Sequence, residues 1–276
     1  MAVQMFRKMP FSLVYQKYML PVSTEVFNTV LSYVKDKTNG RPLDMALDVG
    51  CGTGRYTVPL APHFKKVLGI DISESQINVA KQNTLERNVS YMVAPAEKLP
   101  INDDSVDLVN ASLAAHWFPV DEFVNEAVRV LKKNGCLAAH AFYPANEIEY
   151  KNLSHDLNEV MSKVWDTLFQ YVEPSNLTRE VDHMLSQYQD IYEAIPLKDK
   201  KWITDIRVKI PMSVSDIIGY IQSVCMFQMF LQKDVTGAEE FLIQTEKRFR
   251  DILGEEADSA LLNVYSKHYC VLACKH

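Results

Sequence analysis

Three glycines at alternating positions, Gly50, Gly52 and Gly54, follow an apolar run that ends near Asp48. A strand, a tight glycine turn and a helix start in this order let the backbone approach a nucleotide-like ligand closely, because glycine has no Cβ in the way. The chain has only nine glycines, and four of them fall between positions 50 and 69. The sequence therefore predicts that the working site lies at this turn.

A second carboxylate follows at the end of the next apolar run. Asp71 lies 23 residues after Asp48, and at a strand end its oxygens can accept hydrogen bonds from both hydroxyls of a ribose. The glycine spacing is G-x-G-x-G and not the G-x-G-x-x-G of dinucleotide-binding turns, and the loop has no Lys-Ser or Lys-Thr pair for phosphate. These residues favour a nucleoside-like ligand without a pyrophosphate.

The elements that must position these residues alternate along the chain. From residue 44 to residue 143, apolar runs typical of buried strands are separated by segments typical of helices, which implies an α/β fold with a parallel sheet covered on both faces. The expected strands are 45–49, 67–70, 89–93, 106–110 and 136–142, and the expected helices are 55–63, 74–86 and 120–131.

The alternation stops after Pro144, where aromatic and polar helical patterns begin. We expect a single domain of residues 1–276, since no linker or repeat divides the chain. Its expected parts are N-terminal helices at 1–40, a ligand-binding core at 44–143, an inserted helical cap at 147–200, and residues 201–276, whose strands (202–210 and 261–274) and helices (213–233 and 238–253) complete the sheet.

Composition limits the possible partners. A net charge of −6 over 276 residues argues against a nucleic acid as the main partner. The five cysteines are odd in number and lack the spacing of a zinc site, so we expect reduced thiols and no metal. No apolar run approaches the ~18 residues of a membrane span, and the N-terminus lacks the apolar core of a signal peptide. We therefore expect a cytoplasmic protein without a membrane partner, as a monomer or weak homodimer.

At this point the chain resembles the class I S-adenosylmethionine-dependent methyltransferases of methyltransferase type 11. The resemblance covers about residues 44–143, and it rests on five motifs in order: Leu47-Asp48-Val49-Gly50-Cys51-Gly52-Thr53-Gly54, Gly69-Ile70-Asp71-Ile72-Ser73, Ala96-Glu97-Lys98-Leu99-Pro100, Asp107-Leu108-Val109 and Ala127-Val128-Arg129-Val130-Leu131-Lys132-Lys133-Asn134-Gly135. It implies a Rossmann-like, seven-stranded, mostly parallel sheet of order 3-2-1-4-5-7-6, with the last strand antiparallel, helices on both faces and a helical cap. Ala114-Ala115-His116-Trp117-Phe118 and Ala141-Phe142-Tyr143 look more like the trans-aconitate methyltransferase branch.

The resemblance also implies roles for residues that bind S-adenosyl-L-methionine. Asp48 would hold the ammonium group, Asp71 the ribose, and Ile72 the adenine, with a tyrosine of the N-terminal region closing over the cofactor. The expected cofactor-binding residues are Tyr18 (with Tyr15 as its neighbour in this role), Asp48, Gly50, Cys51, Gly52, Asp71, Ile72, Ala96, Glu97, Asn110 and Ala111. One departure is Pro95, where many relatives have an Asp that accepts from the adenine amino group, and Pro95 has neither an acceptor side chain nor an N–H.

The acceptor site is less constrained by the sequence. His116 follows the fourth strand, where acceptors approach in this fold, and is the candidate for proton handling; packing beneath the cap is the alternative for His116 and Trp117. Trp117, Tyr143 and Arg179 are candidates for contacts with the substrate. A carboxylate acceptor, giving a methyl ester, needs no general base, and a cation such as Arg179 would orient it.

Three alternatives remain open at this stage. The first is O-, S- or N-methylation of another metabolite with His116 as the base. The second is an NAD-dependent oxidoreductase, against which the glycine spacing argues. The third is a non-catalytic cofactor-binding protein that serves as an interaction partner, which fold alone does not exclude.

Overall fold

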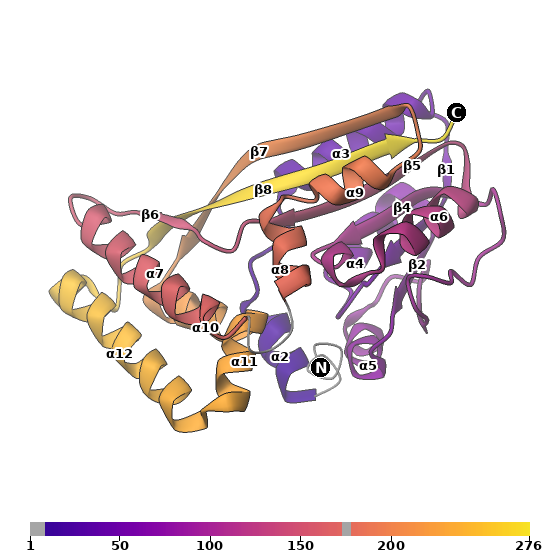
Figure 1. The fold of residues 1–276 in the computed structure, drawn as a ribbon. Coiled ribbons are helices and arrows are strands. Elements are labelled where there is room, and N and C mark those ends of the chain that lie inside the picture. Colours follow the sequence, from indigo (N-terminus) through magenta and orange to yellow (C-terminus); the bar gives the residue numbers. More distant parts are fainter. Residues whose placement is uncertain (1–8, 173–177) are drawn as a thin grey trace.

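A single mixed sheet forms the centre of the molecule (Figure 1). The computed structural model describes residues 9–172 and 178–276, with side chains from Leu13 on, so the predicted helical residues 1–8 lie outside the described residues. The strands, in spatial order, are β3 (Val89–Val93), β2 (Phe64–Asp71), β1 (Leu43–Val49), β4 (Val106–Ser112), β5 (Leu131–Phe142), β8 (Leu262–Cys274) and β7 (Asp199–Met212). Strand β8 is antiparallel to both of its neighbours. The predicted order, 3-2-1-4-5-7-6 with an antiparallel last strand, is therefore confirmed.

The sheet has an eighth strand that the sequence analysis did not predict. β6 (Glu147–Glu149) pairs with Asn263–Tyr265 of β8, where it continues the line of β5 after a break. The prediction of helix from residue 147 is wrong here, because residues 147–149 form a strand that pairs with the edge of β8. Helix α7 (Ser154–Phe169) starts the helical part.

Parallel pairing aligns the strand ends that carry the predicted site. Asp48 of β1 is in register with Gly69 of β2 and with Asn110 of β4. Carboxyl ends of neighbouring parallel strands meet at one edge of a sheet, and in folds of this kind ligands bind in the crevice outside that edge. The residues that follow β1, β2 and β4 therefore gather at one place.

Helices cover both faces of the sheet, as the alternation predicted. On one face, α3 (Thr24–Lys37) begins at an N-cap Ser23, whose hydroxyl accepts from the Val26 N–H at 3.1 Å, and buries Val30 and Val34 against the strands. On the other face, α6 (Val120–Val130) buries one apolar stripe that includes Phe123. Shortening the fully buried Phe123 to Ala would cost about 3–5 kcal/mol. The remaining helical elements around the sheet are α2 (Met9–Tyr18), α4 (Thr57–Leu60), η1 (Ala61–His63), α5 (Glu74–Asn83), η2 (Ala115–Trp117), α8 (Thr178–Leu185) and α9 (Gln189–Ala194).

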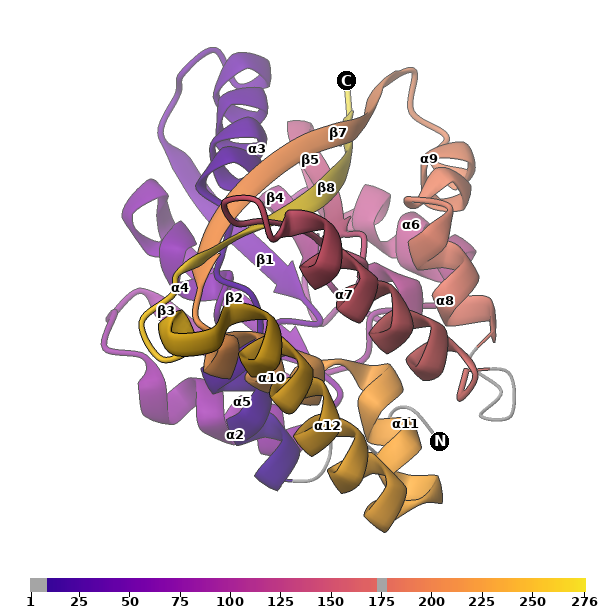
Figure 2. The same cartoon turned by 90° about the vertical axis from the view of Figure 1, so that its left-hand side faces the viewer.

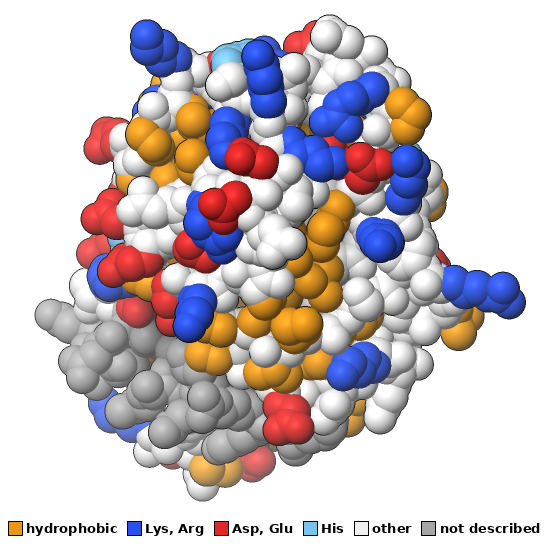
Figure 3. Space-filling model, turned by 90° about the vertical axis from the view of Figure 1, so that its right-hand side faces the viewer, with side chains coloured by type: hydrophobic (Ala, Val, Ile, Leu, Met, Phe, Trp, Pro, Cys, Tyr) orange, Lys and Arg blue, Asp and Glu red, His pale blue; other side chains and the backbone are white. Residues whose placement is uncertain are grey.

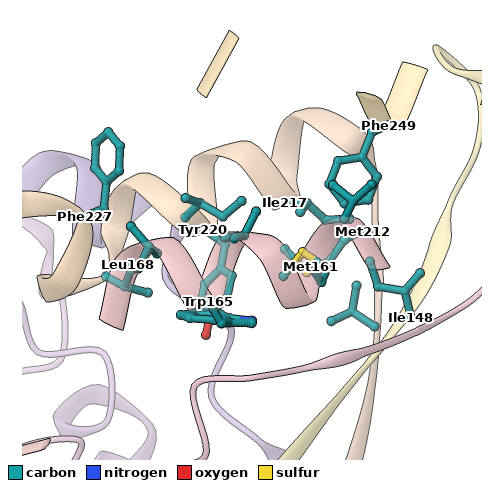
Figure 4. Packing of buried hydrophobic residues seen from close by; sticks show 14 of the residues in the cluster. Ile148, Met161, Trp165, Leu168, Met212, Ile217, Tyr220, Phe227 and Phe249 are labelled. Atoms are coloured by element: carbon teal, nitrogen blue, oxygen red, sulfur yellow. The ribbon is translucent and has the colours of Figure 1, made fainter. Parts of the chain in front are cut away.

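A helical layer stands beyond the carboxyl edge of the sheet (Figure 2). It consists of α7, α10 (Val214–Ser223), α11 (Cys225–Lys233) and α12 (Val235–Leu253), with η4 (Gly254–Glu256) after it. Strands β7 and β8 reach it because β8 pairs with β5 only over residues 268–274, whereas its first half extends past the end of β5. In Figure 4, Trp165 and Met161 of α7 face Tyr220 and Ile217 of α10 across the core of this layer.

The predicted single helix over 213–233 is broken in two. Val224 has extended dihedral angles, and α10 and α11 meet there at 73°. A straight helix could not bury both Tyr220 in the core of the layer and Phe227 and Phe230 against α12, so tertiary packing overrides the local helical pattern. Among the described residues, no single helix is long and apolar enough to cross a membrane. Only α10 and α11 taken together reach that length and apolar character, and they are bent by 73°.

The face on the right of Figure 1 carries charges of both signs. Lys, Arg, Asp and Glu side chains intermingle over its upper part, and hydrophobic side chains gather in a band near its centre (Figure 3). Opposite charges this close together largely cancel one another at a distance.

Candidate functional site

A cavity of about 240 Å³ opens at the carboxyl ends of β1, β2, β3 and β4. It is the place where the glycine turn, the two strand-end aspartates and the N-terminal helix come together. Its walls are formed by Tyr15, Leu20, Asp48, Gly50, Cys51, Gly52, Thr53, Arg55, Tyr56, Asp71, Ile72, Gln76, Ala94, Pro95, Ala96, Glu97, Ser112, Leu113, Ala114, Trp117, Phe118 and Pro119.

The glycine turn is shaped by positive φ angles at Gly50 (+67°) and Gly52 (+56°), which residues with a side chain rarely adopt. A Cβ on Gly50 would lie 2.5 Å from the Cβ of Ala114, so this glycine permits close packing of the turn on the segment after β4. A Cβ on Gly52 would meet nothing nearer than Gln76 Oε1 at 3.9 Å. Gly52 therefore leaves free space beside the cavity that a ligand can use.

Asp48 is buried at the base of the cavity, with a side chain that other polar groups hold in place. Its Oδ2 accepts from the Thr57 hydroxyl at 2.6 Å, and its Oδ1 accepts from Asn110 Nδ2 at 2.8 Å. Burial raises the pKa of Asp48 to about 6, although both hydrogen bonds act in the opposite direction. The carboxylate is thus mostly ionised at neutral pH, but at an energetic cost that a bound cation would relieve.

Asp71 supports the glycine turn as well as facing the cavity. Its Oδ2 accepts from the Gly52 N–H at 2.9 Å, and its Oδ1 accepts from the Ser73 N–H at 2.8 Å. Burial raises its pKa, and these backbone donors partly oppose the shift. The Ile72 N–H is a third backbone donor to this carboxylate, so of its about four acceptor positions one remains for a hydroxyl group of a ligand.

The residues expected around adenine all line the cavity. Ile72 leaves 47% of its surface exposed there, which is unusual for an isoleucine and suits a flat apolar partner. Ala96 and Glu97 also line the cavity, and Pro95 stands between Ala94 and Ala96 without a donor or an acceptor side chain.

One acceptor in the cavity points to a ligand with hydrogen-bond donors. Gln76 is 2% exposed, and its Oε1 has no hydrogen-bond partner among the described residues. A buried acceptor without a donor costs about 1–3 kcal/mol, so a hydroxyl or ammonium group from a ligand would stabilise it. With the free space beside Gly52 and the ionised Asp48, the residues present fit a nucleoside that carries an amino acid, which is the shape of S-adenosyl-L-methionine.

Some predicted cofactor residues lie behind the cavity wall. Asn110 and Ala111 are buried and do not line the cavity, and Asn110 acts on it only through its hydrogen bond to Asp48. Tyr18 also lies outside, since its ring packs against α10 at Gly219, where a Cβ would collide with it. Tyr15, one turn earlier in α2, lines the cavity. Of the two tyrosines expected to close over the cofactor, only Tyr15 lines the cavity, because the helix turns Tyr18 toward α10.

His116 does not reach the cavity. It is buried, its Nδ1 shares a hydrogen bond of 2.8 Å with the Tyr188 hydroxyl, and its ring lies beside that of Trp117. Burial, together with the charge of His183, lowers the pKa of His116 to about 3. The position of His116 therefore gives no support for its predicted role as a catalytic base, whereas Trp117 does form part of the wall.

The other two acceptor candidates are also outside the cavity. Tyr143 follows β5, and its N–H donates to the Lys267 carbonyl at 2.8 Å. Arg179 is exposed on α8, and its Nη2 donates to the Phe118 carbonyl at 3.1 Å. Arg179 thus supports the wall from outside without offering a cation to a bound molecule.

Sequence reasoning missed several wall residues. Arg55 and Tyr56 come directly after the glycine turn, and their place in the motif was a signal that could have identified them. Gln76 and Ser112 had no such signal, because helix packing and strand length decide where they point.

One group of potential metal ligands lies at the end of β8, away from the cavity. Among the described residues, Asp199, Cys274 and His276 place ligand atoms within 4.8 Å of one another. Lys37 Nζ, however, lies 2.7 Å from Asp199 Oδ2, and His276 Nε2 lies 2.8 Å from the same atom. An ammonium group at this position opposes a cation, so the geometry gives no support for a metal site.

Comparisons with known proteins agree with this geometry. Residues 47–139 match the family model described as a methyltransferase domain. A protein of Dictyostelium discoideum named as a methyltransferase is 28% identical over 270 residues, which cover 95% of this chain and 92% of that protein. A ubiquinone biosynthesis O-methyltransferase of Pelagibacter ubique is 30% identical over 112 residues, 39% of this chain and 47% of that protein. This chain therefore aligns with less than half of that enzyme.

Solved structures share the fold. The structure of a type II methyltransferase from Anaeromyxobacter dehalogenans superposes with a TM-score of 0.69 at 23% identity, over 89% of this chain and 97% of that one. None of these relatives tests the resemblance to the trans-aconitate branch, which stays a prediction. The solved structure shows that the fold is shared, and the matched domain together with the relative aligned over nearly the whole chain supports a class I S-adenosylmethionine-dependent methyltransferase.

Proposed function

We propose that this methyltransferase acts on a small molecule whose accepting atom is an uncharged oxygen, sulfur or nitrogen. The observation that carries the proposal is the charge of the wall. Asp48, Asp71 and Glu97 are acidic, and Arg55, whose guanidinium is bound to main-chain carbonyls, is the one Lys or Arg among the described residues that form it.

The cofactor supplies an electrophilic methyl group, and the residues of the chain supply binding and orientation. Asp48 would bind the ammonium group, and Asp71 and Gln76 would accept from the ribose hydroxyls. Ile72 and Ala96 would enclose the adenine. These contacts leave Tyr15, Leu113 and Trp117 to surround the acceptor, and their apolar surface would exclude water from the reacting atoms.

A carboxylate acceptor remains the competing substrate class. It would need a cation for orientation, and Arg179, the candidate from the sequence, is exposed and engaged with the Phe118 carbonyl. O-methylation, the reaction in the name of the Pelagibacter relative, needs no such cation. Proton removal from a hydroxyl would then fall to water or to a group other than His116.

The test is transfer from methyl-labelled S-adenosyl-L-methionine into fractions of a metabolite extract, followed by mild base. A methyl ester releases labelled methanol, whereas a methyl ether, thioether or N-methyl group keeps the label. Retained label is the expected result, and released methanol would overturn the proposed acceptor class. Arg179→Ala should leave transfer unchanged. Binding of S-adenosylhomocysteine without transfer to any fraction would favour the non-catalytic alternative.

A further inference from the structure

One side chain joins the glycine turn to the helix above the cavity. Arg55 directly follows Gly54, and its guanidinium donates four hydrogen bonds to main-chain carbonyls at the end of α2. Nη1 reaches Tyr15 O at 3.2 Å and Gln16 O at 3.1 Å. Nη2 reaches Met19 O at 2.9 Å and Leu20 O at 2.8 Å.

Two of these carbonyls, Tyr15 O and Gln16 O, belong to the last turn of α2, and Tyr15 O also accepts from the Met19 N–H at 3.1 Å; Met19 and Leu20 directly follow the helix. The last four carbonyls of an α-helix have no partner within the helix, and a cation near them also interacts favourably with the helix dipole. Most of the stability of a helix in a protein comes from tertiary packing. Arg55 supplies four such contacts, two to the last turn of α2 and two to the residues that directly follow it.

Two further contacts hold α2 on either side. The Thr53 hydroxyl, also in the glycine turn, donates to Gln16 Oε1. On the opposite side, the Tyr18 ring fills the space that Gly219 leaves on α10. Helix α2 thus lies between the glycine turn and α10, in the arrangement that Figure 1 shows around α2, α10 and α5.

The held segment is part of the cavity wall. Tyr15 and Leu20 line the cavity, and two of the four carbonyls that Arg55 binds belong to these residues. Movement of this segment would therefore open the cavity on that side. We propose that Arg55 is a positioning residue that clamps α2 over the bound cofactor and so limits the rate at which the cofactor leaves.

The experiment measures release of S-adenosylhomocysteine and amide hydrogen exchange over residues 13–20, so that no acceptor is needed. In Arg55→Met we expect release to be about 10–100-fold faster, the effect of losing one or two charge-assisted hydrogen bonds, and exchange in this segment to be faster even without ligand. Arg55→Lys keeps the charge but has three donors and not five, so an intermediate rate is expected. Arg207→Met is the matched control, because Arg207 is exposed and pairs with Glu147 away from the cavity.

The inference rests on S-adenosyl-L-methionine as the cofactor. The outcomes distinguish failure of the proposed function from failure of the Arg55 clamp. Native protein that fails to bind S-adenosylhomocysteine would overturn both the proposed function and the clamp. Native binding with unchanged release and exchange in Arg55→Met would overturn only the clamp. If Arg55→Met does not fold, Arg55→Lys decides: faster release at an unchanged melting temperature supports the clamp, and native release overturns it.

Discussion

Asp48→Asn should make the free protein more stable while it weakens cofactor binding. The buried carboxylate has its pKa raised from 3.8 to about 6, and a rise of this size corresponds to about 3 kcal/mol of unfolding free energy lost when the group is ionised. An amide at this position can still accept from Asn110 and can donate to the Thr57 hydroxyl, so the hydrogen bonds survive. We expect the free energy of unfolding at pH 7.5 to rise by about 1–3 kcal/mol.

The pH dependence of the unfolding free energy tests independently whether Asp48 destabilises the free protein. Between about pH 4 and pH 6 the native state binds more protons at Asp48 than the unfolded state does, so this residue makes native stability fall as pH rises through that window. The advantage of Asp48→Asn over the native protein should therefore grow from pH 4 to pH 6 and then remain constant. Cofactor binding has the opposite dependence in the native protein: affinity should weaken as pH falls below about 6, where Asp48 becomes neutral.

Urea unfolding at several pH values and calorimetry with S-adenosylhomocysteine measure both quantities. The affinity of Asp48→Asn should be about 10–100-fold lower, because a charge-assisted hydrogen bond to the ammonium is lost. Asp44→Asn is the matched control at the other end of β1: Lys132 and Lys65 hold the pKa of Asp44 below its usual range, so its loss should lower stability or leave it unchanged, with native affinity. An Asp48→Asn protein that is less stable than the native chain, or that binds the ligand equally well, would refute the reasoning.

Four further substitutions test other parts of the site. Gly50→Ala should lose about 2–4 kcal/mol of stability from its positive φ and the 2.5 Å approach to Ala114. Gly52→Ala should lose only about 1–2 kcal/mol, from its positive φ, and should also lose ligand affinity because its methyl group enters the cavity; urea unfolding and calorimetry separate the two variants. Gln76→Met should bind S-adenosylhomocysteine about 2–10-fold more weakly yet melt at a higher temperature without ligand, because it removes a buried acceptor that lacks a donor. His116→Gln should keep the native pH profile of methyl transfer between pH 6 and pH 8, since burial lowers the pKa of His116 to about 3. If the variant instead loses a pH-dependent change in rate that the native protein shows in this range, His116 acts as a base.

The parallel strands and the edge of the sheet at which they end were predictable from local patterns, whereas the strand order came from the resemblance to the family. Apolar runs mark buried parallel strands, and each strand of this kind ends at the same edge, so Asp48 and Asp71 had to lie close together. The positive φ angles at Gly50 and Gly52 are likewise what an alternating glycine turn indicates. These features depend on residues near in sequence.

What was missed depends on residues far apart in sequence. Whether Tyr15 or Tyr18 faces the cavity follows from how α2 is rotated, and Gly219 of α10, some 200 residues away along the chain, decides that rotation. The break at Val224 and the capture of residues 147–149 by β8 likewise come from packing that no local window contains. His116 was misplaced for the same reason, because its partner Tyr188 belongs to a segment that the sequence pattern assigned only to the cap.

The residues behind the cavity explain how a buried carboxylate stays correctly oriented. An ionised carboxylate only accepts hydrogen bonds, so the Asn110 amide must turn its NH2 group toward Asp48. The amide oxygen of Asn110 then faces His140, whose Nε2 lies 3.1 Å away and must carry the proton. Burial lowers the pKa of His140 to about 3, so a neutral ring supplies this N–H at physiological pH. A chain of donors from β5 through β4 to β1 thus fixes the direction of Asp48, so Asn110, which was expected beside the cofactor, orients the Asp48 carboxylate from behind the cavity wall.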